Sequence, residues 1–95
     1  MSDAPPSVRA SFTIVNARGL HARAATKLVQ TASRFDADVE LQKDGHVANG
    51  KSVMGVLLLC GSMGTVIDVR ARGAEAEAAL RAIGELIAAR FGEPE

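Results

Sequence analysis

Residues 8–35 read VRASFTIVNARGLHARAATKLVQTASRF, and this stretch predicts a strand, a turn and a helix in succession. Apolar and polar side chains alternate from Val8 to Ile14, which is the period of a strand with one buried face. The following segment, residues 16–19, has the composition of a turn. Beyond it, apolar residues recur at steps of three and four, which predicts an amphipathic helix of about four turns. These residues are Ala22, Ala25, Leu28, Val29, Ala32 and Phe35.

The chain after residue 35 predicts three more strands and two more helices. The expected elements are strands over residues 38–42, around residue 47 and over 65–72, and helices over 53–59 and 74–91. Asp44-Gly45 is a strong two-residue hairpin signal between the first two of these strands. Ser52 is a candidate N-cap for the shorter helix, which Gly61 would end.

The predicted order is therefore β-α-β-β-α-β-α, which favours the α+β class. Two β-α-β units with right-handed crossovers, each skipping a strand in space, give a four-stranded, mainly antiparallel sheet. Its three helices would cover one face, so the expected architecture is an open-faced β-sandwich.

The chain has 95 residues, 47% of them hydrophobic, which suits one small domain with a single core. We assign residues 1–7 to a flexible N-terminal tail, residues 8–92 to the domain and residues 93–95 to a C-terminal tail. The only cysteine, Cys60, excludes an internal disulfide. Together with the lack of a signal-peptide pattern, it favours a cytoplasmic location.

Composition argues against two classes of partner. The 11 Lys and Arg balance the 11 Asp and Glu, and the chain has no Trp or Tyr, so a nucleic-acid-binding module is not expected. The longest apolar run, residues 56–60, is far shorter than the ~20 residues of a membrane span. We therefore expect no nucleic acid and no membrane insertion, and a monomer is the simplest oligomeric state.

The charge is uneven along the chain. Residues 16–34 contain Arg18, Arg23, Lys27 and Arg34 and no acidic residue, whereas acidic side chains gather near the C-terminus. The first of these regions would favour an anion.

His21 falls where the predicted turn meets the start of the first helix. The first backbone N–H groups of a helix have no partner within it, and the helix dipole places its positive end there. A phosphoryl group carried on His21 would be stabilised at this position, and Arg23 adds a planar cation that can bind phosphate oxygens. The same field disfavours imidazolium, so we expect unphosphorylated His21 to be largely neutral at pH 7 and nucleophilic. The alternative from the residues alone is a histidine that merely caps the helix.

Other reactive side chains carry no comparable signal. His46 is expected to be an exposed hairpin residue, and Cys60 a small buried residue at the end of the second helix. With His21 they fall on three separate elements, so no metal site is expected. No phosphate-binding glycine loop, paired carboxylates or catalytic triad is evident, and no cofactor is expected.

Two stretches resemble the HPr family, the histidine-containing phosphocarriers of the bacterial phosphoenolpyruvate-dependent sugar phosphotransferase system. Residues 19–25, Gly-Leu-His-Ala-Arg-Ala-Ala, are similar to the family's active-site motif. Residues 49–57, Asn-Gly-Lys-Ser-Val-Met-Gly-Val-Leu, look like its second signature. Together with the element order, the resemblance covers nearly all of residues 8–91.

The resemblance implies a role for three residues. His21 matches the histidine that accepts a phosphoryl group on Nδ1 from phospho-enzyme I and passes it to an enzyme IIA domain. Arg23 matches the arginine that contacts this group. Ser52 matches a serine that HPr kinase/phosphorylase modifies in some bacteria. The protein would then be a carrier with a phosphohistidine intermediate rather than a stand-alone enzyme.

In the family, the first two helices also form the surface that binds enzyme I and the IIA proteins. We expect some side chains of the short apolar helix to remain exposed there, with Met54 the best candidate. Arg18, Lys27 and Lys51 would surround this surface and meet acidic partners. The candidate partner-binding residues are Arg18, Leu20, Lys27, Lys51, Met54 and Leu58.

One position departs from the family pattern, and several alternatives stay open. The family usually has proline directly after the active-site arginine, where this chain has Ala24, which leaves the subfamily undecided. The main alternative is a nitrogen-related phosphocarrier of the same fold. Others are a regulatory protein-binding module without phosphotransfer and a ferredoxin-like domain for a small ligand.

Overall fold

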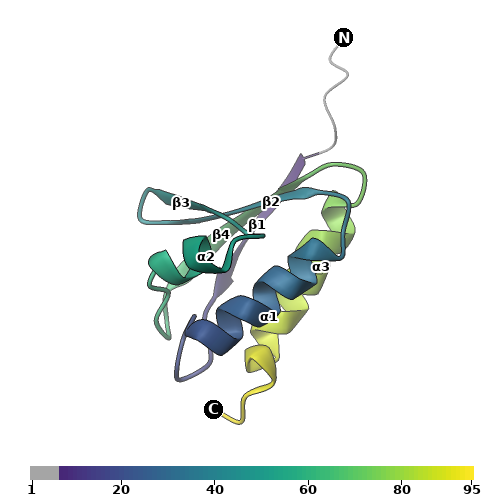
Figure 1. The fold of residues 1–95 in the computed structure, drawn as a ribbon. Coiled ribbons are helices and arrows are strands. Elements are labelled where there is room, and N and C mark those ends of the chain that lie inside the picture. The colour runs from purple at the N-terminus through teal and green to yellow at the C-terminus, as the bar shows by residue number, and fades with distance from the viewer. Residues whose placement is uncertain (1–6) are drawn as a thin grey trace.

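The computed structural model describes residues 7–95 and has the element order predicted from the sequence (Figure 1). The elements are β1 (Ser7–Thr13), α1 (Ala22–Ser33), β2 (Asp38–Lys43), β3 (His46–Asn49), α2 (Val53–Leu58), β4 (Val66–Arg72), α3 (Ala76–Ala88) and a 3-10 turn, η1 (Arg90–Gly92). Residues 1–6 of the expected N-terminal tail lie outside the described residues. Ser7, which was assigned to that tail, is the first residue of β1 and pairs with Arg72.

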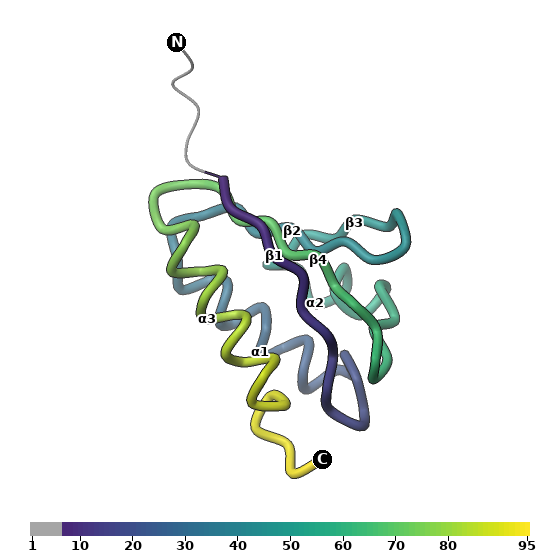
Figure 2. The backbone as a smooth tube through the Cα atoms, turned by 180° about the vertical axis from the view of Figure 1, so that it is seen from behind, coloured from purple at the N-terminus to yellow at the C-terminus, as the bar shows by residue number. Residues whose placement is uncertain are grey.

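The four strands form one sheet in the order β1-β4-β2-β3, and every neighbouring pair is antiparallel. Strand β4 lies between β1 and β2, so these two strands are not neighbours in the sheet. Helix α1 connects them by crossing over β4. All three helices lie on one side of this sheet (Figures 1 and 2). The expected open-faced, four-stranded α+β fold is confirmed.

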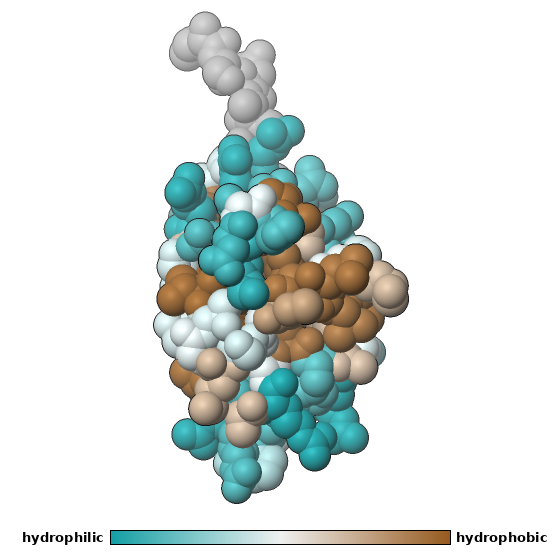
Figure 3. Space-filling view, turned by 90° about the vertical axis from the view of Figure 1, so that its left-hand side faces the viewer, coloured by the Kyte–Doolittle hydropathy of each residue, from teal (hydrophilic) through white to brown (hydrophobic). Residues whose placement is uncertain are grey.

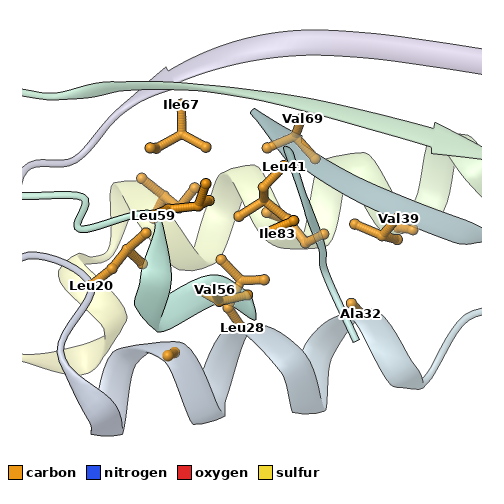
Figure 4. Packing of buried hydrophobic residues seen from close by; sticks show 14 of the residues in the cluster. Leu20, Leu28, Ala32, Val39, Leu41, Val56, Leu59, Ile67, Val69 and Ile83 are labelled. Carbon is orange, nitrogen blue, oxygen red and sulfur yellow. The ribbon is translucent and has the colours of Figure 1, made fainter. Parts of the chain in front are cut away.

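The core fills the space between the helices and the sheet (Figure 4). Strand alternation directs Ile67 and Val69 of β4 toward the helices, where Leu28 of α1 and Ile83 of α3 meet them, and all four are fully buried. Val56 of α2 completes the layer. The other sheet face stays open. No helix within residues 7–95 has the length and apolar character needed to cross a membrane.

The end of the chain differs from the expected helix over residues 74–91. α3 ends at Ala88, and Arg90 and Phe91 adopt left-handed conformations with φ of 57° and 55°. This turn breaks the helical path but brings the Phe91 side chain into the core, where it is only 1% exposed. The last residues consequently run toward the start of α1, where the Ala17 N–H donates to the Glu95 carbonyl at 3.0 Å.

Candidate functional site

His21 is the N-cap of α1. Its backbone is extended, and its carbonyl accepts the first helical hydrogen bond from the Ala25 N–H at 2.8 Å. The ring turns toward the open end of the helix, where Nδ1 accepts from the Arg23 N–H at 3.3 Å. His21 is half-buried and Arg23 is exposed. The predicted placement of a histidine at the positive end of a helix is therefore present in the structure.

The loop before His21 packs against the segment that follows α2. Gly19 has a φ of +65°, and a Cβ there would overlap the Gly61 carbonyl oxygen and lie 2.9 Å from the Ser62 Cα. The next residue, Leu20, donates its N–H to that same carbonyl at 2.7 Å. This close approach pulls the Leu20 side chain into the core, where it is 5% exposed. Leu20 is thus a core residue, which corrects its assignment to a partner-binding surface.

A carboxylate from the last residues of the chain contacts the imidazole. Glu93 Oε2 lies 2.5 Å from His21 Nε2, and Glu93 Oε1 accepts from Asn16 Nδ2 at 3.0 Å. The same amide nitrogen of Asn16 donates to the Gly19 carbonyl at 2.9 Å. Residues 93–95 were assigned to a C-terminal tail, but in the structure Glu93 is part of the site because the turn at Phe91 directs the chain there.

The environment of Glu93 favours its charged form. Its pKa is lowered below the ordinary 4.5, first by the hydrogen bond from Asn16 and then by that with His21, with smaller contributions from the charges of His21 and Arg18. Partial burial opposes this shift. A neutral His21 imidazole was expected from the positive end of the helix alone, and the negatively charged Glu93 carboxylate beside Nε2 was not anticipated.

Two guanidinium groups lie beside this contact. A hollow of about 230 Å³ is lined by Ala17, Arg18, Arg23, Glu93, Pro94 and Glu95. Within residues 7–95, neither Arg18 nor Arg23 forms an ion pair. Both side chains are exposed, and their guanidinium N–H groups can donate hydrogen bonds to an anion at the N-terminal end of α1.

Ser52 is the N-cap of α2, as expected. Its Oγ accepts from the Gly55 N–H at 3.1 Å, and the side chain is only partly buried. α2 has six residues and buries only Val56 fully, so much of its apolar surface faces outward. Met54 is 65% exposed and Leu58 74% exposed, and Met63 in the next loop is 59% exposed. We call these three side chains the α2 patch.

The side of the molecule on which α2 and β3 lie shows an apolar area with hydrophilic side chains above and below it (Figures 1 and 3). Both lysines that were expected to surround such a surface donate to backbone carbonyls. Lys27 Nζ donates to the Phe91 carbonyl at 2.6 Å, and Lys51 Nζ donates to the Phe35 carbonyl at 3.1 Å. The third cation, Arg18, lines the hollow with Arg23.

The remaining candidates are His46 and Cys60. His46 is exposed at the start of β3. Cys60 is also exposed, which corrects the expectation of a buried thiol; its left-handed backbone, with a φ of 54°, follows the end of α2 directly. In the part of the chain that the structure describes, no three His, Cys, Asp or Glu side chains gather as metal ligands.

Asn16 and Glu93 are members of the site that the sequence patterns did not predict. Asn16 was assigned only to a turn, although it is fully buried. The available signal was the charge asymmetry, because a cation-rich segment at residues 16–34 and an acidic C-terminus are complementary. That signal indicates attraction between the two regions, but it does not identify which acidic residue reaches the histidine.

Comparisons with known proteins agree with this geometry. The family model described as "PTS HPr component phosphorylation site" matches residues 8–89. A Phosphocarrier protein HPr from Xylella fastidiosa is 49% identical over 82 residues, which cover 86% of this chain and 92% of the relative. A Phosphocarrier protein NPr from Shewanella violacea is 47% identical over 81 residues, covering 85% of this chain and 89% of that protein. The crystal structure of HPr-C-His from Thermoanaerobacter tengcongensis has a TM-score of 0.89 at 40% identity, covering 93% of this chain and 99% of that one.

Proposed function

The chain belongs to the HPr family of the phosphotransferase system, and from this premise we propose that His21 accepts a phosphoryl group from phospho-enzyme I and passes it to an enzyme IIA domain. The observation that carries the proposal is the position of His21 as N-cap of α1, inside the matched residues 8–89. A nucleophilic ring nitrogen at this end of a helix has unpaired backbone N–H groups beside it.

The chemistry requires positioning and charge stabilisation rather than a metal or cofactor in the carrier. The positive end of α1 and the Arg23 guanidinium would stabilise the negative phosphoryl oxygens during transfer. Because the group must also leave, an exposed position suits a carrier better than a closed pocket. The partly exposed ring and the open hollow beside Arg23 support this assignment.

Incubation with phosphoenolpyruvate and a bacterial enzyme I tests the proposal directly. We expect the native protein to gain the mass of one phosphoryl group, and this label to be lost in acid and kept in alkali. His21→Ala should gain none, whereas His46→Ala, which removes the other histidine, should label like the native protein. Absence of label on folded native protein, with enzyme I shown to be active, would contradict the proposal and favour a regulatory binding module.

We also propose that the α2 patch, with Arg18, contributes to the docking surface for enzyme I and IIA domains. Met54 and Leu58 are apolar side chains that remain exposed on a short helix, and such patches are typical of protein-binding sites. Lys51 directly precedes Ser52, the N-cap of α2, and Lys27 lies on α1, which packs against α2; each donates to a backbone carbonyl and keeps its ammonium charge. Acidic partner surfaces fit these cations and would associate in a salt-sensitive way.

Ser52 is proposed as a regulatory phosphorylation site for an HPr kinase/phosphorylase. Ser52 lies at the start of α2 and is only partly buried, and a phosphate there would gain from the helix end. The added charge of about −1.5 to −2 would lie next to the apolar Met54 and oppose an acidic partner. Treating native protein and Ser52→Ala with the kinase and ATP tests this, since only the native protein should be modified.

A nitrogen-related phosphocarrier is the second candidate, because the NPr relative is nearly as similar as the HPr relative. Both candidates use His21, so they differ only in partners. Transfer rates from a sugar-branch enzyme I and from its nitrogen-related counterpart would separate them. A clear preference for the nitrogen-related donor would replace the sugar-branch assignment.

A further inference from the structure

The Glu93 carboxylate is held by a fixed donor on one side. Asn16 is fully buried, and its Nδ2 bonds both Glu93 Oε1 and the Gly19 carbonyl. The opposite amide orientation would place Oδ1 against these two oxygens, so the donor nitrogen must face Glu93. The Oδ1 atom is left buried without a partner within the described residues. The loop that leads to His21 therefore also positions the group that holds Glu93.

The chain on both sides of Glu93 is anchored as well. Before it, Phe91 is buried in the core and its carbonyl accepts from Lys27 Nζ at 2.6 Å. After it, the Glu95 carbonyl accepts from the Ala17 N–H at 3.0 Å. Lys27 lies on α1, the same helix that His21 caps. Residues 91–95 thus form a strap whose attachment points fix the carboxylate relative to the imidazole.

We propose that Glu93 is a positioning residue for phosphoryl transfer, holding the His21 ring with its proton on Nε2 and the lone pair of Nδ1 at the front of α1. This inference rests on the proposed function of His21. An ionised carboxylate only accepts hydrogen bonds, so the Nε2 atom beside it must carry the proton. In a neutral ring Nδ1 is then the acceptor, in agreement with its contact to the Arg23 N–H.

The same contact matters during the reaction. The Arg23 N–H releases the lone pair of Nδ1, which forms the new N–P bond while the P–N bond of the donor phosphohistidine breaks, and the electron pair of the broken bond returns to the donor nitrogen. No proton moves, but the His21 ring becomes positive and keeps its Nε2 proton. Glu93 faces this nitrogen, on the far side of the ring from the phosphoryl group. The negative carboxylate therefore stabilises the positive charge that develops on the ring. Because it lies at Nε2, it places no negative side chain beside the phosphoryl group at Nδ1.

Imidazole NMR spectra of the unphosphorylated protein test the positioning role without any transfer. With ¹⁵N-labelled histidine, we expect native His21 to show a protonated Nε2, an unprotonated Nδ1 and a low-field Nε2 proton signal from the hydrogen bond to the Glu93 carboxylate. Glu93→Ala should lose the low-field signal. Glu95→Gln is the matched control, because it removes a carboxylate from the same strap, keeps the backbone bond to Ala17 and leaves the His21 contact intact.

Transfer kinetics from phospho-enzyme I provide the second readout. We expect Glu93→Ala to lower the maximal rate about tenfold, which corresponds to ~1.4 kcal/mol of lost transition-state stabilisation, and to leave KM nearly unchanged. Glu93→Gln keeps a hydrogen-bond acceptor but not the charge, so its maximal transfer rate should lie between those of Glu93→Ala and Glu95→Gln. Native-like imidazole signals in Glu93→Ala, or native transfer rates in both Glu93 variants, would overturn the inference. Failure of the proposed function is distinct, because then the native protein itself would not be labelled.

Discussion

Gly19 lies where the loop before His21 passes over Gly61 and Ser62. Its φ of +65° is costly for residues with a Cβ, and that atom would also overlap the Gly61 carbonyl. We expect Gly19→Ala to lower the free energy of unfolding by about 2 kcal/mol or more, measured by urea denaturation. Gly45→Ala is the control, because its φ is +81° but nothing lies within 4 Å, so it should lose only about 1 kcal/mol. Equal losses would show that the contact with Gly61 has no energetic role.

Glu93 makes the stability of the native protein sensitive to acid. Its folded-state pKa lies below the ordinary 4.5, so the stabilisation it provides is present above that value and lost as the pH falls through the lowered pKa. The groups that face the carboxylate are the Asn16 amide, the His21 ring and the Arg18 guanidinium. We expect the difference in unfolding free energy between native protein and Glu93→Gln to shrink as the pH falls from about 5 through the lowered pKa of Glu93. A difference that stays constant or grows over that range, in urea titrations, would contradict this reading.

At the scale of elements, α2 depends on its first residue. The helix has only six residues, and Ser52 supplies the side-chain acceptor for one of its unpaired N–H groups. Ser52→Ala should therefore lower the free energy of unfolding by about 1 kcal/mol. Ser52→Asp keeps an acceptor at the N-cap and should stay close to the native value. If urea denaturation gave the same loss for both variants, the cap bond to Gly55 would not be the cause.

Most elements were predictable because each has a strong local pattern. The alternation around Ile67 and Val69 and the helical spacing around Leu28 both reflect burial against one common core, so pattern and structure agree. The motif with His21 at a loop–helix junction was recognisable for the same local reason. Phe91 is different, because its left-handed backbone is stabilised by contacts with the rest of the fold rather than by its own residue type.

The remaining differences have the same physical origin. Leu20 is in a loop, and loops are mostly exposed, but the close approach to Gly61 buries it. Glu93 comes after the last helix and has no periodic pattern of its own. Its contact with His21 spans 72 positions in sequence, so only the assembled fold brings the two together.

For the whole molecule, the exposed α2 patch should contribute to recognition and little to stability. Met54 and Leu58 lose little burial on substitution, so Leu58→Glu should change the free energy of unfolding by less than about 0.5 kcal/mol. In phosphoryl transfer from phospho-enzyme I, we expect the KM for the Leu58→Glu variant to rise about tenfold. The maximal rate should stay nearly unchanged, because the substitution affects docking and not the chemical step. Val47→Glu is the matched control: Val47 is 58% exposed on β3, and the alternation that buries Ala48 toward the helices places it on the open sheet face. If the KM rose equally in both variants, the added charge rather than the loss of the α2 patch would be what weakens docking. An unchanged KM in Leu58→Glu would place the docking surface elsewhere.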